Sequence, residues 1–182
     1  MRVIHRLSPV AATFAMAAAM ALSASTAQAS VLSGGGIGLH LGQGDHYQRL
    51  ELAWESPSLW DHAFTGNNSR LDLVGELGVA YWKGTGGHSP NAWQLSAIPF
   101  LRWTYHNRFY VEGGIGPTVF SRTTVAGETI STAFQFGDQI GIGAYLSNNS
   151  RLGFRFSHFS NASIKTPNPG LNVFQLLYTY QY

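Results

Sequence analysis

The sequence predicts an all-β protein, an eight-stranded antiparallel transmembrane β-barrel, on three observations. Apolar and polar residues alternate with period two in eight separate segments, as expected of strands whose two faces meet different environments. Charged residues make up 11% of the chain and aromatic residues 13%, whereas soluble domains carry roughly 25% charged residues. Beyond residue 29 no apolar run approaches the ~20 residues that a membrane-spanning helix needs.

The N-terminal segment has the features of a secretory signal peptide. Basic residues Arg2 and Arg6 precede an alanine-rich apolar run, and Ala27 and Ala29 supply the small side chains that signal peptidase requires. We therefore expect residues 1–29 to be removed and residues 30–182 to form one exported barrel. The chain contains no cysteine, which argues against a small disulfide-stabilised scaffold.

The eight alternating segments span 34–42, 48–55, 70–82, 92–104, 108–119, 134–146, 151–160 and 172–182. In a membrane barrel the apolar positions of each segment face lipid and the alternate positions face the interior. The predicted lipid-facing residues are, segment by segment, Ile37, Leu39 and Leu41; Leu50, Leu52 and Trp54; Leu71, Leu73, Leu77, Val79 and Tyr81; Trp93, Leu95, Ala97, Pro99, Leu101 and Trp103; Phe109, Val111, Ile115 and Val119; Phe134, Phe136, Ile140, Ile142 and Leu146; Leu152, Phe154 and Phe156; and Phe174, Leu176, Tyr178, Tyr180 and Tyr182.

Charged residues of both signs fall on the opposite, inward face of these segments. A barrel of so few strands is filled by side chains, and buried opposite charges must pair. We interpret these residues as a neutralising structural network and not as a catalytic one: Arg49, Glu51, Asp72, Glu76, Arg102, Glu112 and Arg155.

A soluble β-barrel or sandwich would show the same alternation with the apolar face inside. The aromatic residues gathered at strand ends favour the membrane barrel, since they match the aromatic girdles at membrane interfaces. The final strand also alternates tyrosines and ends on Tyr182. This ending resembles the sorting signal of outer-membrane barrels, so the barrel-assembly machinery is an expected partner. The sequence leaves open whether two barrels pair as a homodimer.

If both termini are periplasmic, the strands alternate outward and inward along the chain. Segments 106–108 and 147–150 then become short periplasmic turns, and the longer segments after residues 82, 120 and 160 become outer loops. The connection from Ser56 to Ser69 is long for a periplasmic turn, and the alternation offers no explanation for it.

His158 and Ser160 continue the outward parity of Phe154 and Phe156, at the outer end of the seventh strand. The neighbouring strands place Asp138 and Asn172 on the same face and near the same height. A histidine that takes the proton of a serine, with a third group that orients the imidazole, is the arrangement used for acyl transfer. Polar residues that merely decorate the membrane interface are an equally valid interpretation of these residues alone.

The stretch "FRFSHFSNASIKTPNPG" resembles the outer-membrane lipid A 3-O-deacylases, the PagL family. The resemblance lies in His-aromatic-Ser-Asn-Ala, then Lys, then Pro-Asn-x-Gly, followed by a final aromatic strand. It implies an eight-stranded barrel in the bacterial outer membrane that hydrolyses the ester-linked acyl chain at position 3 of lipid A, without metal or cofactor. It further implies that Ser160 is the nucleophile, His158 the general base, and Asn161 with the backbone N–H of Ser163 the oxyanion hole.

The family usually carries a glutamate shortly after Pro-Asn-x-Gly, where this chain has Asn172. Either Asn172 orients His158 as a neutral acceptor, or Asp138 supplies the charge from the other neighbouring strand. Loss of activity is a third reading, and it would leave a non-catalytic small barrel serving adhesion or envelope structure. A soluble lipocalin-like carrier is a further alternative. The net charge of +2 is too small to indicate a nucleic-acid partner.

Overall fold

The computed structural model describes residues 34–182. The predicted signal peptide, residues 1–29, lies outside the described residues, as do residues 30–33. The described chain forms eleven strands: β1 (Gly36–Gln43), β2 (Tyr47–Glu55), β3 (Trp60–Phe64), β4 (Ser69–Gly84), β5 (Ala92–Tyr105), β6 (Phe109–Phe120), β7 (Thr124–Val125), β8 (Glu128–Thr129), β9 (Phe134–Ser147), β10 (Ser150–Ser160) and β11 (Leu171–Gln181). Within residues 34–182 no helix is long and apolar enough to cross a membrane.

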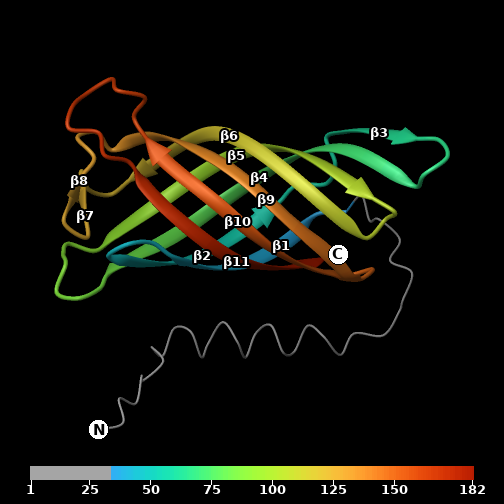
Figure 1. Ribbon diagram of the computed structural model, residues 1–182, viewed down its shortest axis with the longest axis horizontal. Coiled ribbons are helices and arrows are strands. Elements are labelled where there is room, and N and C mark those ends of the chain that lie inside the picture. Colours follow the sequence, from blue (N-terminus) through green and yellow to red (C-terminus); the bar gives the residue numbers. More distant parts are fainter. Residues whose placement is uncertain (1–33) are drawn as a thin grey trace, which may run out of the picture.

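Eight of these strands close into an antiparallel barrel, which confirms the predicted fold class (Figure 1). The order around the barrel is β1, β2, β4, β5, β6, β9, β10 and β11, and β11 pairs with β1 to complete the ring. Each barrel strand coincides with one of the eight alternating segments, with ends that differ by at most two residues.

The unexplained connection between residues 56 and 69 contains a further strand. β2 pairs with one stretch of β4, from Glu76 to Gly84, and β3 pairs with the stretch before it, from Ser69 to Leu73. β3 therefore continues the pairing with β4 after a break in the chain that follows β2. It extends this hairpin beyond the barrel, as the turquoise ribbon in Figure 1 shows. The side chains of β3 are all exposed.

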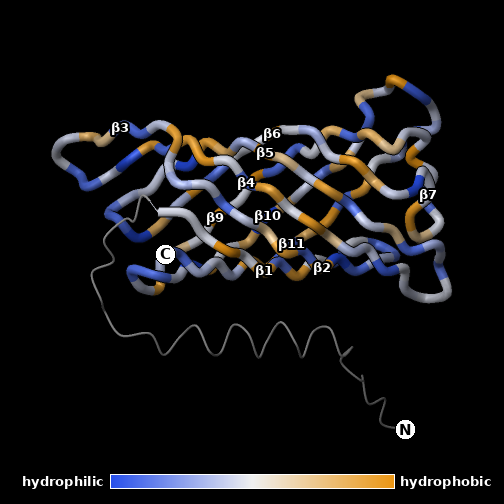
Figure 2. Tube along the Cα trace, turned by 180° about the vertical axis from the view of Figure 1, so that it is seen from behind, coloured by the Kyte–Doolittle hydropathy of each residue, from blue (hydrophilic) through white to orange (hydrophobic). Residues whose placement is uncertain are grey.

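The outer surface of the barrel is apolar, as the parity of the segments predicts. Side chains such as Ile140, Phe154 and Phe174 are more than half exposed, although they are large and hydrophobic. Figure 2 shows apolar and polar residues alternating along the strands around the wall. Leu176 shares the outward parity but is buried. A continuous exposed apolar surface of this kind is the part of the protein that contacts lipid.

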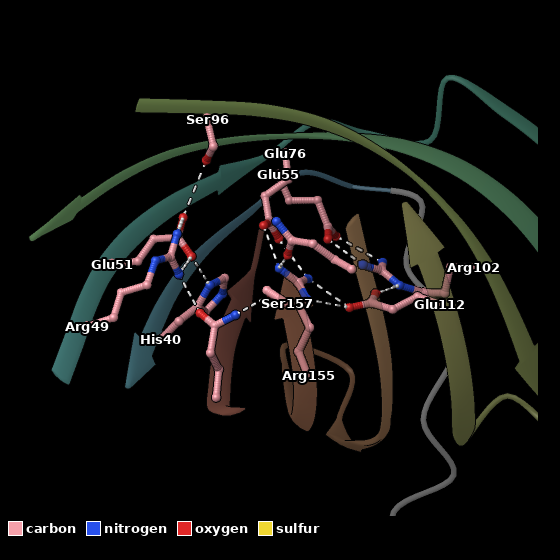
Figure 3. A network of polar contacts seen from close by, with 12 residues as sticks. His40, Arg49, Glu51, Glu55, Glu76, Ser96, Arg102, Glu112, Arg155 and Ser157 are labelled. Carbon is pink, nitrogen blue, oxygen red and sulfur yellow. Dashed lines mark hydrogen bonds and ion pairs between the residues drawn. The ribbon is translucent and has the colours of Figure 1, made fainter. Parts of the chain in front are cut away.

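The interior holds a network of ion pairs built from the inward-facing charges (Figure 3). Arg155 bonds both Glu76 and Glu112, at 2.7 Å each, and Arg102 joins Glu112 to Glu55. Arg151, which the sequence analysis did not include, also pairs with Glu55. Nearer the outer end, Glu51 accepts hydrogen bonds from Arg49 and pairs with His40. Opposite charges in this interior thus neutralise one another.

Aromatic side chains fill the outer end of the barrel above this network. Trp82, Phe120 and Phe159 pack edge to face or tilted, with ring centroids 5.5–6.0 Å apart. The outer loop that carries β7 and β8 folds against the same cluster and buries Val125 and Ile130 completely. The connections at this end, residues 85–91, 121–133 and 161–170, are the predicted outer loops, and in Figure 1 they lie together at the end opposite β3.

Candidate active site

His158 and Ser160 lie at the outer end of β10, and the residue between them fixes the direction of both. Phe159 is fully buried and packs on Trp82 inside the barrel, with ring centroids 5.5 Å apart. Because successive side chains of a strand alternate, His158 and Ser160 are held on the outer face. Both are half-buried there.

Among residues 34–182, the His158 side chain makes one hydrogen bond, which joins the imidazole to β11. The two residues face each other in the register of β10 and β11, and His158 Nδ1 lies 2.7 Å from Asn172 Oδ1. An amide oxygen only accepts hydrogen bonds, so His158 Nδ1 must carry the proton and donate it. The same tautomer leaves Nε2 unprotonated, with its lone pair available as a base.

Asp138 faces His158 from the other side, on β9. The register pairs His158 with Asp138 directly. Asp138 is exposed, and within residues 34–182 no side-chain hydrogen bond joins it to His158. Of the two residues that could orient the imidazole, Asn172 is the one in contact with it.

Ser160 ends β10 and leads into a tight turn with unusual backbone geometry. Residues 161–164 form a turn closed by the hydrogen bond that Ile164 N–H donates to the Asn161 carbonyl at 3.0 Å. Its central residues, Ala162 and Ser163, have φ values of 51° and 63°. Two successive positive φ angles define a type I′ turn, and for residues with a Cβ each costs about 1–2 kcal/mol. Strain of this kind gathers at functional sites.

Asn161 does not point its amide toward the outer face. The side chain is fully buried, and its Nδ2 donates to the carbonyls of Ile130 at 3.1 Å and Lys165 at 2.8 Å. Its backbone N–H donates to Asn168 Oδ1 at 3.2 Å. The Asn161 side chain thus ties the turn both to its own loop and to the loop that carries β8.

Ser160 and His158 share a face but are not joined. Residues two apart on a strand are separated by roughly 6.6 Å along its axis, and within residues 34–182 no hydrogen bond links Ser160 to His158. Such contacts are often long in enzymes without substrate and tighten when substrate binds. The structure therefore brings His158 and Asn172 into contact, places Asp138 beside them and leaves Ser160 adjacent.

Two residues of this site were missed by the sequence analysis. Gly170 has a φ of 73°, and a Cβ there would lie 2.4 Å from His158 Cε1, so only glycine fits beneath the ring. The Pro-Gly pair that ends the loop was a signal for such a position. Tyr47 forms two hydrogen bonds with the backbone of Asn172, at 2.9 and 3.0 Å. No local pattern could indicate a contact across 125 residues of sequence.

Two depressions flank the site on the outer surface. One is apolar and crosses β9, β10 and β11 on the membrane side of His158, between Ile140, Phe156 and Phe174. The other is more polar, lies at the outer rim beside Asn172 and Gly170, and includes Asp45 and Glu128. Phe174 lines both. A molecule with one polar and one apolar part could occupy both depressions across His158.

One group among the described residues has metal-ligand spacing, and it lies far from this site. Ligand atoms of His40, Glu51 and Glu76 approach within 4.8 Å of one another inside the barrel. Both glutamates already accept hydrogen bonds from buried arginines, Arg49 and Arg155. The ion-pair network accounts for this group.

The chain resembles known proteins along almost its entire described length. A family model for "Lipid A 3-O-deacylase (PagL)" matches residues 48–181. A lipid A deacylase PagL of Bordetella bronchiseptica is 56% identical over 164 residues, which cover 90% of this chain and 92% of that protein. One of Pseudomonas aeruginosa is 31% identical over 178 residues, covering 96% and 98%.

A solved structure shows the same likeness in three dimensions. The crystal structure of the outer membrane enzyme PagL aligns with a TM-score of 0.70 and 26% sequence identity, covering 81% of this chain and 99% of that one. The match of sequence and fold over the whole barrel leaves one conclusion. The chain belongs to the lipid A 3-O-deacylase (PagL) family.

Proposed function

We propose that this protein is a serine esterase that removes the ester-linked acyl chain at position 3 of lipid A. Ser160 is the nucleophile, His158 the general base and Asn172 the group that orients the imidazole. The observation that carries the proposal is the 2.7 Å hydrogen bond from His158 to Asn172, on the same lipid-facing surface as Ser160. Family membership supplies the substrate, since both relatives are named lipid A deacylases.

The location of the site suits a lipid substrate. The protein is an outer-membrane β-barrel, and lipid A occupies the outer leaflet of that membrane. His158 and Ser160 stand at the outer end of β10, where the apolar wall meets the outer loops. A substrate could reach them laterally from the membrane with its acyl chains along the apolar depression and its sugars at the polar one.

The first half of the reaction transfers the acyl group to the enzyme. Ser160 Oγ attacks the ester carbonyl carbon while His158 Nε2 takes the hydroxyl proton. The tetrahedral intermediate collapses with cleavage of the bond between the carbonyl carbon and the sugar oxygen. His158 Nε2 returns the proton to that oxygen, so the deacylated sugar leaves with a free 3-hydroxyl and Ser160 carries the acyl chain.

The second half repeats these steps with water. His158 Nε2 removes a proton from water as the hydroxide attacks the acyl-serine, and then returns it to Ser160 Oγ. The fatty acid leaves and the enzyme is restored. Throughout both halves Asn172 Oδ1 accepts the Nδ1 proton, which keeps Nε2 as the nitrogen that exchanges protons.

The turn after Ser160 provides the donors for the negative charge that forms on the ester oxygen. Successive backbone N–H groups in a turn can form a small concavity that favours anions. The N–H of Ser163, in the strained turn, is therefore the proposed oxyanion donor. Asn161 contributes to the oxyanion hole by holding this turn through Ile130 and Lys165, because fixed donors stabilise developing charge without reorganising.

Mass spectrometry of lipid A tests the activity directly. The protein and its Ser160→Ala variant are expressed in a bacterium that lacks a deacylase of this type, and lipid A is extracted. The active protein should remove one ester-linked acyl chain, and Ser160→Ala should leave lipid A intact. Unchanged lipid A with the folded parent protein in the outer membrane would instead favour a non-catalytic barrel.

A further inference from the structure

The backbone of Asn172 lies just beyond the end of the strand that should pair with it. β1 ends at Gln43, whose partner on β11 is Phe174, so the ladder between β1 and β11 stops two residues short of Asn172. The Asn172 N–H and C=O that face this side therefore have no strand partner. Backbone groups left in this way normally fray or turn to water.

The hydroxyl of Tyr47 occupies the place of the missing strand. It accepts the Asn172 N–H at 2.9 Å and donates to the Asn172 C=O at 3.0 Å. One phenol oxygen thus makes both hydrogen bonds that a further residue of β1 would have made. It adds one pair to the ladder at the position that contacts His158.

Because both backbone groups of Asn172 point toward Tyr47, they point away from β10. The pair formed by His158 and Asn172 is then of the kind without hydrogen bonds between the two backbones. Side chains in such pairs lie closer together than in the hydrogen-bonded kind. This geometry is consistent with the 2.7 Å contact between His158 Nδ1 and Asn172 Oδ1.

The phenol itself is fixed from inside the barrel. Tyr47 begins β2 and is only 4% exposed, and its ring packs on Trp82 with centroids 5.1 Å apart. Gly44 lies so close that a Cβ there would collide with the ring at 2.0 Å. The packing of the ring therefore fixes the position of the hydroxyl, so that the hydroxyl determines where the Asn172 backbone lies.

We infer that Tyr47 is a positioning residue of the active site, which acts by fixing the Asn172 backbone so that the Asn172 side chain holds His158. The inference rests on the proposed function and extends it to a residue of the barrel interior, which also lines the depression at the outer rim. Nothing in this role requires Tyr47 to touch the reacting atoms.

Tyr47→Phe removes the hydroxyl and leaves the ring in its packing. We expect kcat for lipid A deacylation to fall about tenfold, because two hydrogen bonds to the Asn172 backbone are lost. KM should stay within about twofold, because the ring of residue 47 still lines the depression at the outer rim and the hydroxyl is engaged by the Asn172 backbone. Tyr110→Phe is the matched control: it also removes a buried hydroxyl, but its ring lies against Tyr145, in a separate cluster of the interior, and its activity should match the parent.

A double-mutant cycle with Asn172→Ala separates positioning from general loosening of the barrel. If Tyr47 acts through Asn172, the tenfold effect disappears once Asn172 is alanine, and the double variant equals Asn172→Ala alone. Additive losses would overturn the inference, as would unchanged kcat in Tyr47→Phe or full activity in Asn172→Ala. Folding of each variant is checked by its mobility on unheated gel electrophoresis.

Ser160→Ala distinguishes failure of this inference from failure of the proposed function. If Ser160→Ala is inactive while Tyr47→Phe retains full kcat, only the role of Tyr47 is wrong. If Ser160→Ala remains active, the serine mechanism itself is wrong, and the role assigned to Tyr47 falls with it.

Discussion

At His158, the proposed chemistry depends on which nitrogen of the imidazole carries the proton. The Asn172 oxygen settles this, since it can only accept, and an amide does so without a negative charge. An asparagine can therefore fix the tautomer, but it cannot stabilise the imidazolium as a carboxylate does. Asp138, directly opposite on β9, is the charged group placed to contribute that second effect through space.

These two roles predict that kcat falls by different amounts when Asn172 and Asp138 are replaced. Asn172→Ala should lower kcat by about 10²-fold or more, because the wrong tautomer of a triad histidine costs up to about 10⁴. Asp138→Asn should lower kcat only about threefold, because an exposed charge is screened by solvent. Steady-state kinetics of the purified protein in detergent measures both. A larger loss in Asp138→Asn than in Asn172→Ala would reverse the assignment.

The sequence placed His158 and Ser160 on the lipid-facing surface, because parity carries outward from Phe154 along a single strand. It could not choose between Asn172 and Asp138, because alternation puts both on that face and a side-chain hydrogen bond decides between them. The roles of Gly170 and Tyr47 could not be predicted from the sequence for a related reason. Their roles depend on a close approach to His158 and on a contact between distant strands.

Among the elements, the turn that follows Ser160 is held by a neighbouring loop. The Ile130 carbonyl accepts hydrogen bonds from both Gln135 and Asn161, each at 3.1 Å, and Ser131 Oγ donates to the Pro167 carbonyl at 2.6 Å. The loop that carries β7 and β8 thereby braces residues 161–170. Its burial of Ile130 in the aromatic cluster connects the turn to the barrel interior.

Loss of this brace should loosen the loop as well as slow the reaction. Asn161→Ala removes two hydrogen bonds to carbonyls, so we expect faster cleavage by trypsin after the exposed Lys165 together with lower kcat. Timed proteolysis followed by mass spectrometry measures the first effect. Lower kcat with an unchanged cleavage rate would mean that the Asn161 amide acts on the substrate directly.

The hairpin extension formed by β3 lies at the opposite end and contributes nothing to this site. Replacing residues 57–68 with a short turn should leave deacylation within about twofold of the parent, because the paired region from Glu76 to Gly84 of β4 remains. The deacylation rate in detergent checks this. Loss of activity in a folded barrel would show that the two ends are coupled.

The alternation of apolar and polar residues predicted the barrel strands but not this extension, because β3 has no buried face.

In the whole molecule, different interactions stabilise the outer and inner faces of the barrel wall. Lipid contacts the outer face, while the interior depends on buried ion pairs. Arg102 and Arg155 both depend on Glu112, which is buried among them. The sequence indicated this network from inward charges of both signs, but the individual partners follow from strand tilt and register around the closed barrel.

Breaking the network should affect stability more than chemistry. Glu112→Gln leaves two buried guanidinium groups short of a counter-charge, so we expect the free energy of unfolding to fall by about 3–5 kcal/mol. Urea titration of the barrel in lipid vesicles measures this loss. The folded fraction should retain the parent kcat, since Glu112 lies inside the barrel, away from the outward-facing site; a stable variant with impaired kcat would instead give the network a catalytic role.

We propose that Ser160, on the membrane-facing surface, carries the acyl group during hydrolysis. Mass spectrometry of the protein itself, quenched during turnover of lipid A, tests this proposal. We expect a peptide containing Ser160 with the mass of one added acyl chain, absent from Ser160→Ala. An acyl adduct on another residue, or deacylation that continues in Ser160→Ala, would contradict it.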